Sequence, residues 1–148
     1  MHAGLAGLVM TTLAAPLGCA RVMPAAPAPP EALYVAVHLE RDGQLVAAPR
    51  LLGFEGRRLF AERRAPGAAS PDYRLLLEPD DEGSGYGISL DLELPSGRAH
   101  GKVDLRHGEE RTVSLDARTR LTLLVMRVDS PEFRALMRHR APAPAATI

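Results

Sequence analysis

The segment Tyr86–Leu94, with the sequence YGISLDLEL, decides the fold class of this chain. Its large apolar residues recur at every second position, and the residues between them are small or acidic. Because the side chains of a β-strand alternate between two faces, this pattern predicts a strand with one buried and one solvated face. Such strands are typical of antiparallel sheets that cover a core on one side. The apolar residues are Tyr86, Ile88, Leu90, Leu92 and Leu94.

The same alternation appears on both sides of this segment. Residues 33–39 read as a strand that turns at Asp42-Gly43, a favoured hairpin dipeptide. The returning strand over 44–52 contains Pro49, which predicts an edge strand or a bulge. Further strands are expected over 57–63, 73–78, 99–106, 111–116 and 121–128.

These strands predict an all-β fold, a mostly antiparallel β-sandwich of about 7–8 strands, with an open barrel as the alternative. A loose repeat relates residues 33–78 to residues 86–128 and predicts that each half forms one sheet. One short C-terminal helix follows, because Ser130 can cap a helix that starts at Pro131. Its apolar face would carry Phe133, Leu136 and Met137.

The N-terminal region predicts export. Cys19 is the only cysteine, and it follows an apolar run, Ala3–Leu17, that is too short to span a bilayer comfortably. Leu17-Gly18-Cys19 resembles part of the lipobox of bacterial exported lipoproteins, with Pro16 at the place where that family prefers Leu. The resemblance implies cleavage before Cys19 and lipidation of its sulfur. Alternatively, residues 18–20 form the small-x-small cleavage site of a secreted protein.

The chain therefore divides into four parts. Residues 1–19 form the leader, and residues 20–30 are a Pro/Ala-rich tether of PPII-like character. Residues 31–140 form the β-sandwich domain, and residues 141–148 are expected to be a disordered Ala/Pro tail. We expect a protein of the periplasm or one anchored to the outer membrane, with membrane contact through a lipid only if Cys19 is acylated.

Composition and motifs exclude several function classes. The chain has 18 basic and 18 acidic residues, so it lacks the basic balance that binding of nucleic acid requires. No nucleophile elbow or phosphate-binding loop is present, and we expect no catalytic residue and no cofactor. A metal-dependent enzyme remains as a minor alternative, and it would need His38, His100 and His107 to converge.

The predicted function is that of a non-catalytic binding or accessory module. Its sheet edge or face would recognise an envelope protein or a glycan. The expected edge carries five arginines: Arg50, Arg57, Arg58, Arg63 and Arg64. The alternative is a carrier of a small apolar ligand, with a hollow barrel lined by Ile88, Leu90 and Leu92.

A second resemblance points to the same compartment. The strand Ala48–Leu52, followed by Gly56 and by the strand Tyr73–Pro79, resembles a segment of the β domain of secretins, the outer-membrane secretion channels. It covers about 30 residues. It implies a shared strand arrangement in an envelope protein and carries over no functional residue.

Overall fold

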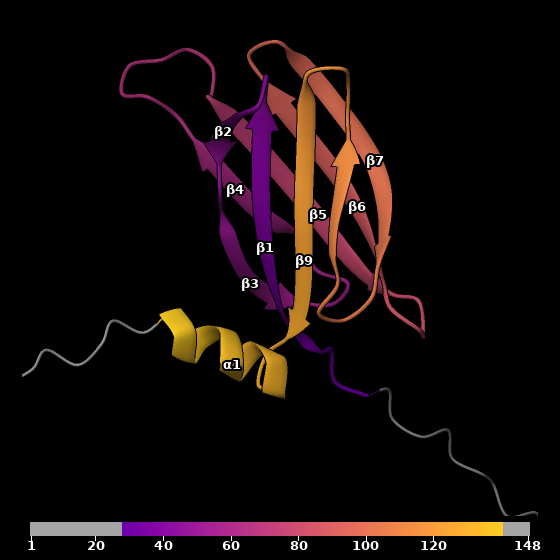
Figure 1. The fold of residues 1–148 in the computed structure, drawn as a ribbon. Helices are drawn as coiled ribbons and strands as arrows, with labels where there is room; N and C mark the ends of the chain where they lie inside the picture. The colour runs from indigo at the N-terminus through magenta and orange to yellow at the C-terminus, as the bar shows by residue number, and fades with distance from the viewer. Residues whose placement is uncertain (1–27, 141–148) are drawn as a thin grey trace, which may run out of the picture.

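The alternation in residues 86–94 forms a strand with one fully packed face. In the computed structural model, which describes residues 28–140, this strand is β6 (Tyr86–Leu94). All five of its inward side chains are at most 9% exposed. The strand lies in one of two antiparallel sheets that pack face to face (Figure 1). The prediction of an all-β sandwich is therefore confirmed.

Nine strands and one helix make up the described part of the chain. The count exceeds the predicted 7–8 because the expected strand over 44–52 is divided at Ala48-Pro49. The strands are β1 (Ala32–Arg41), β2 (Gln44–Ala47), β3 (Arg50–Phe54), β4 (Leu59–Arg63), β5 (Tyr73–Asp81), β6 (Tyr86–Leu94), β7 (Gly97–Leu105), β8 (Glu110–Ser114) and β9 (Thr119–Arg127), and the helix is α1 (Pro131–Arg140).

The two sheets do not correspond to the two halves of the sequence. Sheet A has the order β2-β1-β9-β8, with β3 also paired to β1, and sheet B has the order β4-β5-β6-β7. The prediction that each half of the loose repeat forms its own sheet is wrong. The chain changes sheets between β3 and β4 and returns between β7 and β8, so β1 pairs with β9 from the far end of the domain.

The first change of sheet depends on a close approach at Gly53. A Cβ built on Gly53 would lie 2.0 Å from Cδ2 of Leu59, a side chain that is only 5% exposed. The absence of a side chain therefore lets the end of β3 in sheet A pack on the start of β4 in sheet B. Gly56, with φ of 65°, makes the turn between them.

Two prolines lie in or beside the strands. Pro49 lies in the break between β2 and β3 on the outer edge of sheet A, as the sequence predicts, and its carbonyl accepts from the Val37 N–H of β1 at 3.0 Å. Pro79 lies beyond the strand predicted over 73–78, but β5 continues to Asp81. The carbonyl of Pro79 accepts from the Gly56 N–H at 2.7 Å, so its ring nitrogen faces the same side, beyond the end of β4. The proline therefore costs sheet B no hydrogen bond.

The core lies between the sheets, and α1 covers one outer face. Leu33, Val35, Leu121, Leu123 and Val125 are fully buried on the inner face of sheet A. The helix begins as predicted, because the Ser130 hydroxyl accepts from the Phe133 N–H at 3.1 Å. It then packs at the end of sheet A where β1 begins and β9 ends (Figure 1), and there the rings of Phe133 and Tyr34 lie 5.4 Å apart. The predicted tail (141–148) and leader (1–19), with most of the tether, lie outside the described residues.

Leucine truncation should separate core from surface. We expect Leu123→Ala to lower the free energy of unfolding by about 2–5 kcal/mol, because it leaves a cavity in the middle of the core. Leu45→Ala is the matched control: this side chain is 62% exposed, and its loss should change stability by less than about 0.5 kcal/mol. Urea unfolding followed by circular dichroism measures both, and equal losses would contradict the described packing.

Candidate functional site

The five arginines predicted to line a binding edge lie along the β3–β4 corner but do not form one free basic patch. Arg58 pairs with Glu78 at 3.1 Å, and Arg63 pairs with Asp72 at 3.1 Å. Arg64 pairs with Glu62 at 3.3 Å. Within residues 28–140, Arg50 and Arg57 show no acidic partner; Arg50 is on β3 and Arg57 is in the turn. Most of the positive charge at this corner is therefore neutralised internally.

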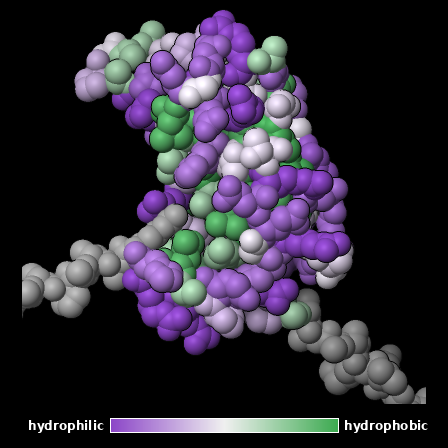
Figure 2. All heavy atoms as spheres, viewed as in Figure 1, coloured by the Kyte–Doolittle hydropathy of each residue, from purple (hydrophilic) through white to green (hydrophobic). Residues whose placement is uncertain are grey.

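The apolar surface of the same corner is the more unusual feature. Four large hydrophobic side chains of the described part are exposed: Leu45, Leu52, Phe54 and Phe60, with exposed fractions of 62%, 68%, 51% and 55%. They belong to β2, β3 and β4, which lie on one side of the sandwich. Figure 2 shows apolar surface on this side and where α1 meets the sheet, bordered by polar atoms. Contiguous apolar surface of this kind marks interaction sites.

The alternation of β3 explains which of these side chains share a face. Leu51 packs against the core, so Arg50, Leu52 and Phe54 project from the outer face of sheet A. Phe60 projects from the outer face of sheet B, because its neighbours Leu59 and Ala61 pack inward. Sequence reasoning missed Leu52 and Phe54 as surface residues. The available signal was their spacing of two residues, in phase with Arg50.

The backbone of β3 leaves one edge without a strand partner. The Val37 N–H donates to Pro49 O at 3.0 Å, and the Glu55 N–H donates to Glu31 O at 2.9 Å. Since the polar groups of successive residues in a strand point to opposite sides, Leu51 and Gly53 provide the ladder to β1. Arg50, Leu52 and Phe54 therefore direct their N–H and C=O groups away from β1, where no strand of the described part pairs with β3. The Phe54 carbonyl accepts from the Arg57 N–H at 3.1 Å in the turn that follows.

Helix α1 shields only the neighbouring part of this outer face. Tyr34, the cross-strand neighbour of Leu52 on β1, lies under Phe133 and is 3% exposed. Met126, on the other side of Tyr34, is 8% exposed. Leu52 itself remains outside this cover. We define the β3 edge as Arg50, Leu52 and Phe54, and it is the candidate site.

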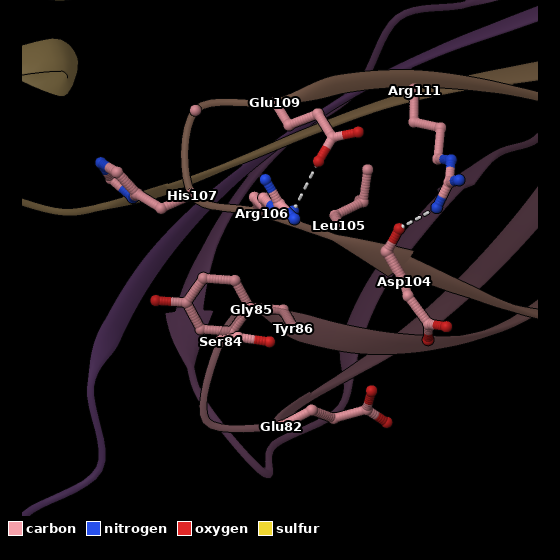
Figure 3. Close-up of a pocket in the computed structure, with 11 residues that line it drawn as sticks. Glu82, Ser84, Gly85, Tyr86, Asp104, Leu105, Arg106, His107, Glu109 and Arg111 are labelled. Atoms are coloured by element: carbon pink, nitrogen blue, oxygen red, sulfur yellow. Dashed lines mark hydrogen bonds between the residues drawn. The ribbon is translucent and has the colours of Figure 1, made fainter.

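A cleft of about 620 Å³ lies at another place, between the β5–β6 and β7–β8 turns (Figure 3). Arg111 donates to the carbonyl of Asp104, and the Arg106 N–H donates to Glu109 at 3.0 Å. The ring of Tyr86 forms part of the wall. The lining mixes carboxylates with arginines, so it selects no single charge.

Two titratable side chains at this cleft are held by hydrogen bonds. The Tyr86 hydroxyl donates to Glu31 at 2.6 Å and accepts from Arg127 Nε at 3.1 Å. Burial, with the hydrogen bond to Glu31, raises the pKa of Tyr86. His107 Nδ1 accepts from the Arg127 N–H at 3.1 Å, so a neutral ring carries its proton on Nε2, which faces Glu132 at 3.2 Å. Both side chains therefore tie turns to the ends of β1 and β9.

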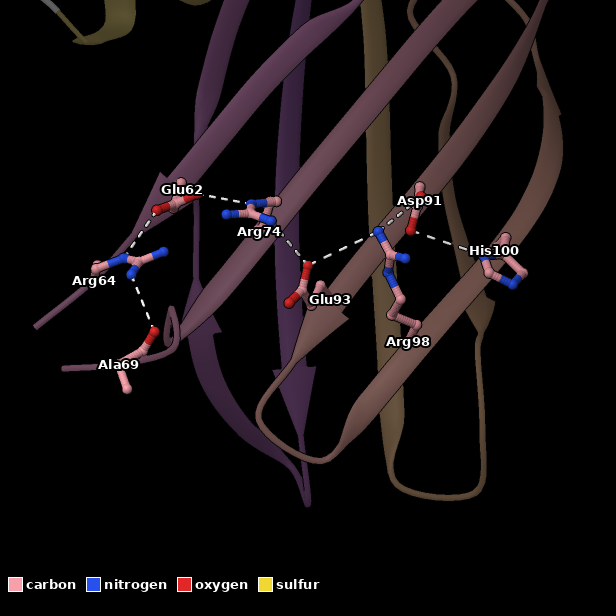
Figure 4. Close-up of polar contacts among 8 residues, drawn as sticks. All are labelled: Glu62, Arg64, Ala69, Arg74, Asp91, Glu93, Arg98 and His100. Atoms are coloured by element: carbon pink, nitrogen blue, oxygen red, sulfur yellow. Dashed lines mark hydrogen bonds and ion pairs between the residues drawn. The ribbon is translucent and has the colours of Figure 1, made fainter.

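The outer face of sheet B carries a row of alternating charges (Figure 4). Arg74 bridges Glu62 at 2.8 Å and Glu93 at 3.2 Å. Arg98 approaches Asp91 at 3.8 Å, and Asp91 also lies 3.8 Å from His100. The hydrogen bond from Arg74 lowers the pKa of Glu62. Since each charge has an opposite neighbour, this face is a solvated surface with no net charge to attract an ion.

The three histidines of the metal-enzyme hypothesis do not come together. His38 projects from the outer face of sheet A, between the buried Val37 and Leu39. His100 lies on the outer face of sheet B beside Asp91, and His107 lies in the β7–β8 turn. No group of three metal-ligating side chains occurs anywhere in residues 28–140.

The side chains expected to line an apolar ligand cavity belong to the packed core. Ile88 and Leu92 are 0% exposed, and Leu90 is 4% exposed. They share one cluster with the inner face of sheet A. The space between the sheets at these positions is therefore filled by protein side chains.

No family model, no curated protein and no solved structure matches this chain. Within the described residues, no helix is long and apolar enough to cross a membrane. The features of the chain that bear on its function are therefore the β3 edge and the sequence of the leader.

Tyr86 should set an alkaline limit to stability. A folded-state pKa raised above the ordinary value near 10 gives a contribution that is complete below about pH 10 and is lost as pH rises through the folded pKa. Tyr86→Phe should lower stability near neutral pH by about 1 kcal/mol through the lost hydrogen bonds. It should also flatten the decline above about pH 10. Urea unfolding between pH 7 and 11 measures this, and an unchanged alkaline decline would contradict the assignment.

Proposed function

We propose that this chain is a non-catalytic, exported protein of the cell envelope that binds a protein partner through the β3 edge. The observation that carries the proposal is the coincidence of two features on β3. The N–H and C=O of Leu52 and the N–H of Phe54 have no strand partner, and the large apolar side chains of both residues are exposed. Proteins normally protect such an edge with charge, because it accepts an added strand.

Strand addition explains why both features are needed. An extended segment that lies along β3 gains main-chain hydrogen bonds from the edge, and its outward side chains pack beside Leu52 and Phe54. A glycan can stack on an aromatic ring such as that of Phe54, but it cannot form a strand-like ladder with the open backbone groups of β3. The edge therefore favours a protein partner over the glycan that the sequence also allowed.

The position of the edge suits a tethered protein. The first described residues and α1 lie at the same end of the sandwich as the β3–β4 turn (Figure 1). In the proposed mature protein, residues 20–30 connect this end to Cys19, and an extended Pro/Ala segment of that length spans roughly 35 Å at 3.1 Å per residue. The domain would then stand clear of the membrane, with β3 accessible from the side.

Site-specific photo-cross-linking tests the edge. A photoreactive phenylalanine analogue at position 52 should yield discrete protein adducts in intact bacteria, because Leu52 would be buried against the partner. The same analogue at position 60 is the matched control, since Phe60 is similarly exposed but lies on the outer face of sheet B. Equal adducts at both positions, or none at position 52, would rule out the β3 edge as the binding surface.

Mass spectrometry of the N-terminus tests export and anchoring. We expect the mature chain to begin at Cys19 with a diacylglycerol adduct, and Cys19→Ala to release the protein from the membrane fraction. An unmodified N-terminus created by cleavage beside residues 18–20 would retain export but exclude the anchor. An intact 1–19 segment on protein in the cytosol would overturn the proposed location.

A further inference from the structure

The β3 edge is complementary to itself. Three residues point their backbone groups to the open side, and they are evenly spaced around Leu52. We propose that the partner bound at this edge is a second copy of the same chain, with the two β3 strands antiparallel and Leu52 opposite Leu52. The inference rests on the proposed function, because it names the occupant of the same edge.

The backbone fixes this register. In an antiparallel pair, outward-pointing residues must lie opposite outward-pointing residues. A pairing centred on Leu52 places Leu52 opposite Leu52 and Arg50 opposite Phe54. The Leu52 pair then exchanges two hydrogen bonds, and the Phe54 N–H of each copy donates to the Arg50 carbonyl of the other, while the Phe54 carbonyl keeps its bond from the Arg57 N–H. A shift by one pair of residues brings a turn or Pro49 against the partner strand and leaves one of the three positions unmatched. A two-fold axis through Leu52 also closes the assembly at two copies.

The side chains agree with that register. The two Leu52 side chains would meet at the axis, where each is now 68% exposed. On both sides of them, Arg50 of one copy would lie beside Phe54 of the other, so an arginine without an acidic partner in residues 28–140 meets an aromatic ring. Such contacts are favourable, whereas an arginine opposite an arginine is not. The register therefore pairs every outward side chain without placing like charges together.

The remaining edges are poorer candidates for self-association. Among the described strands, β7 carries Lys102 and Asp104 close to its end, and β8 carries Glu110 and Arg111. Both are edge strands, and their charges disfavour the approach of a second strand. The edge strand β4 carries Glu62 and Arg63. The edge strand β2 has no charged residue, but it is four residues long and carries one exposed large apolar side chain, Leu45, whereas β3 carries two, Leu52 and Phe54.

Analytical ultracentrifugation of the full chain tests the dimer, with Cys19→Ala throughout so that no lipid or native thiol contributes. We expect a concentration-dependent dimer, and Leu52→Pro should raise its dissociation constant at least tenfold. Proline removes an N–H that points away from β1, so the ladder from Leu51 and Gly53 to β1 is retained. Leu52→Val is the control, because it keeps the N–H and an apolar side chain and should keep the dimer.

Cysteine cross-linking tests the dimer independently if the Leu52→Pro variant does not fold. Residues opposite each other in the hydrogen-bonded positions have Cα atoms about 5.5 Å apart, within disulfide range. In the Cys19→Ala background, Leu52→Cys should form a disulfide-linked dimer under mild oxidation, and Phe60→Cys should not. A monomeric wild type, a dimer unaffected by Leu52→Pro, or equal cross-linking at positions 52 and 60 would overturn the inference. Adducts from position 52 to a different envelope protein would then leave the proposed function standing.

Discussion

The pairing of β1 with β9 is the constraint on which the rest of the structure depends. Nine residue pairs, from Leu33 opposite Arg127 to Arg41 opposite Thr119, join the first and last strands of the domain. Their inward side chains, including Leu33, Val35 and Leu123, are fully buried. Without this pairing sheet A would separate into one part made of β1, β2 and β3 and another made of β8 and β9. The stability of the domain is therefore tied to a contact between its two ends, which is costly in loop-closure entropy and has to be supported by burial.

The candidate site follows from that arrangement. Because β9 occupies one side of β1, the returning chain must use the other side, and Pro49 divides it into the short strands β2 and β3. The chain then leaves sheet A at Gly53 and Gly56, so no later strand covers β3. The β3 edge is therefore unprotected because the chain changes sheets at this point, where the side chain of Leu59 packs against Gly53. Helix α1 returns to the same outer face but covers Tyr34 and Met126 rather than Leu52.

Charged residues contribute little to the recognition surface, although they are numerous. The expected binding arginines, Arg58, Arg63 and Arg64, are engaged by nearby carboxylates, and Arg74 links two acidic residues on sheet B. Ion pairs as exposed as these contribute little to stability. The two charges of each pair nevertheless cancel, so a binding partner meets little net charge there. A single sequence shows the arginines but not the partners that neutralise them, because those partners lie on different strands. For this reason the sequence alone predicts a more basic surface at this corner than the structure shows.

The sequence by itself determined the strands, most of the turns between them and the capped helix. These features depend on neighbours within a few residues: the alternation in β6, Asp42-Gly43, whose residues have φ of 53° and 76°, and the Ser130 cap. Only the tertiary structure decided which strands share a sheet and where Leu52 and Phe54 lie. The alternation of apolar and polar residues predicts that the two faces of a strand differ. It does not predict which strands are neighbours or whether a helix covers the outer face of a sheet. Those choices depend on contacts between residues far apart in the chain, and the β3 edge exists because of them.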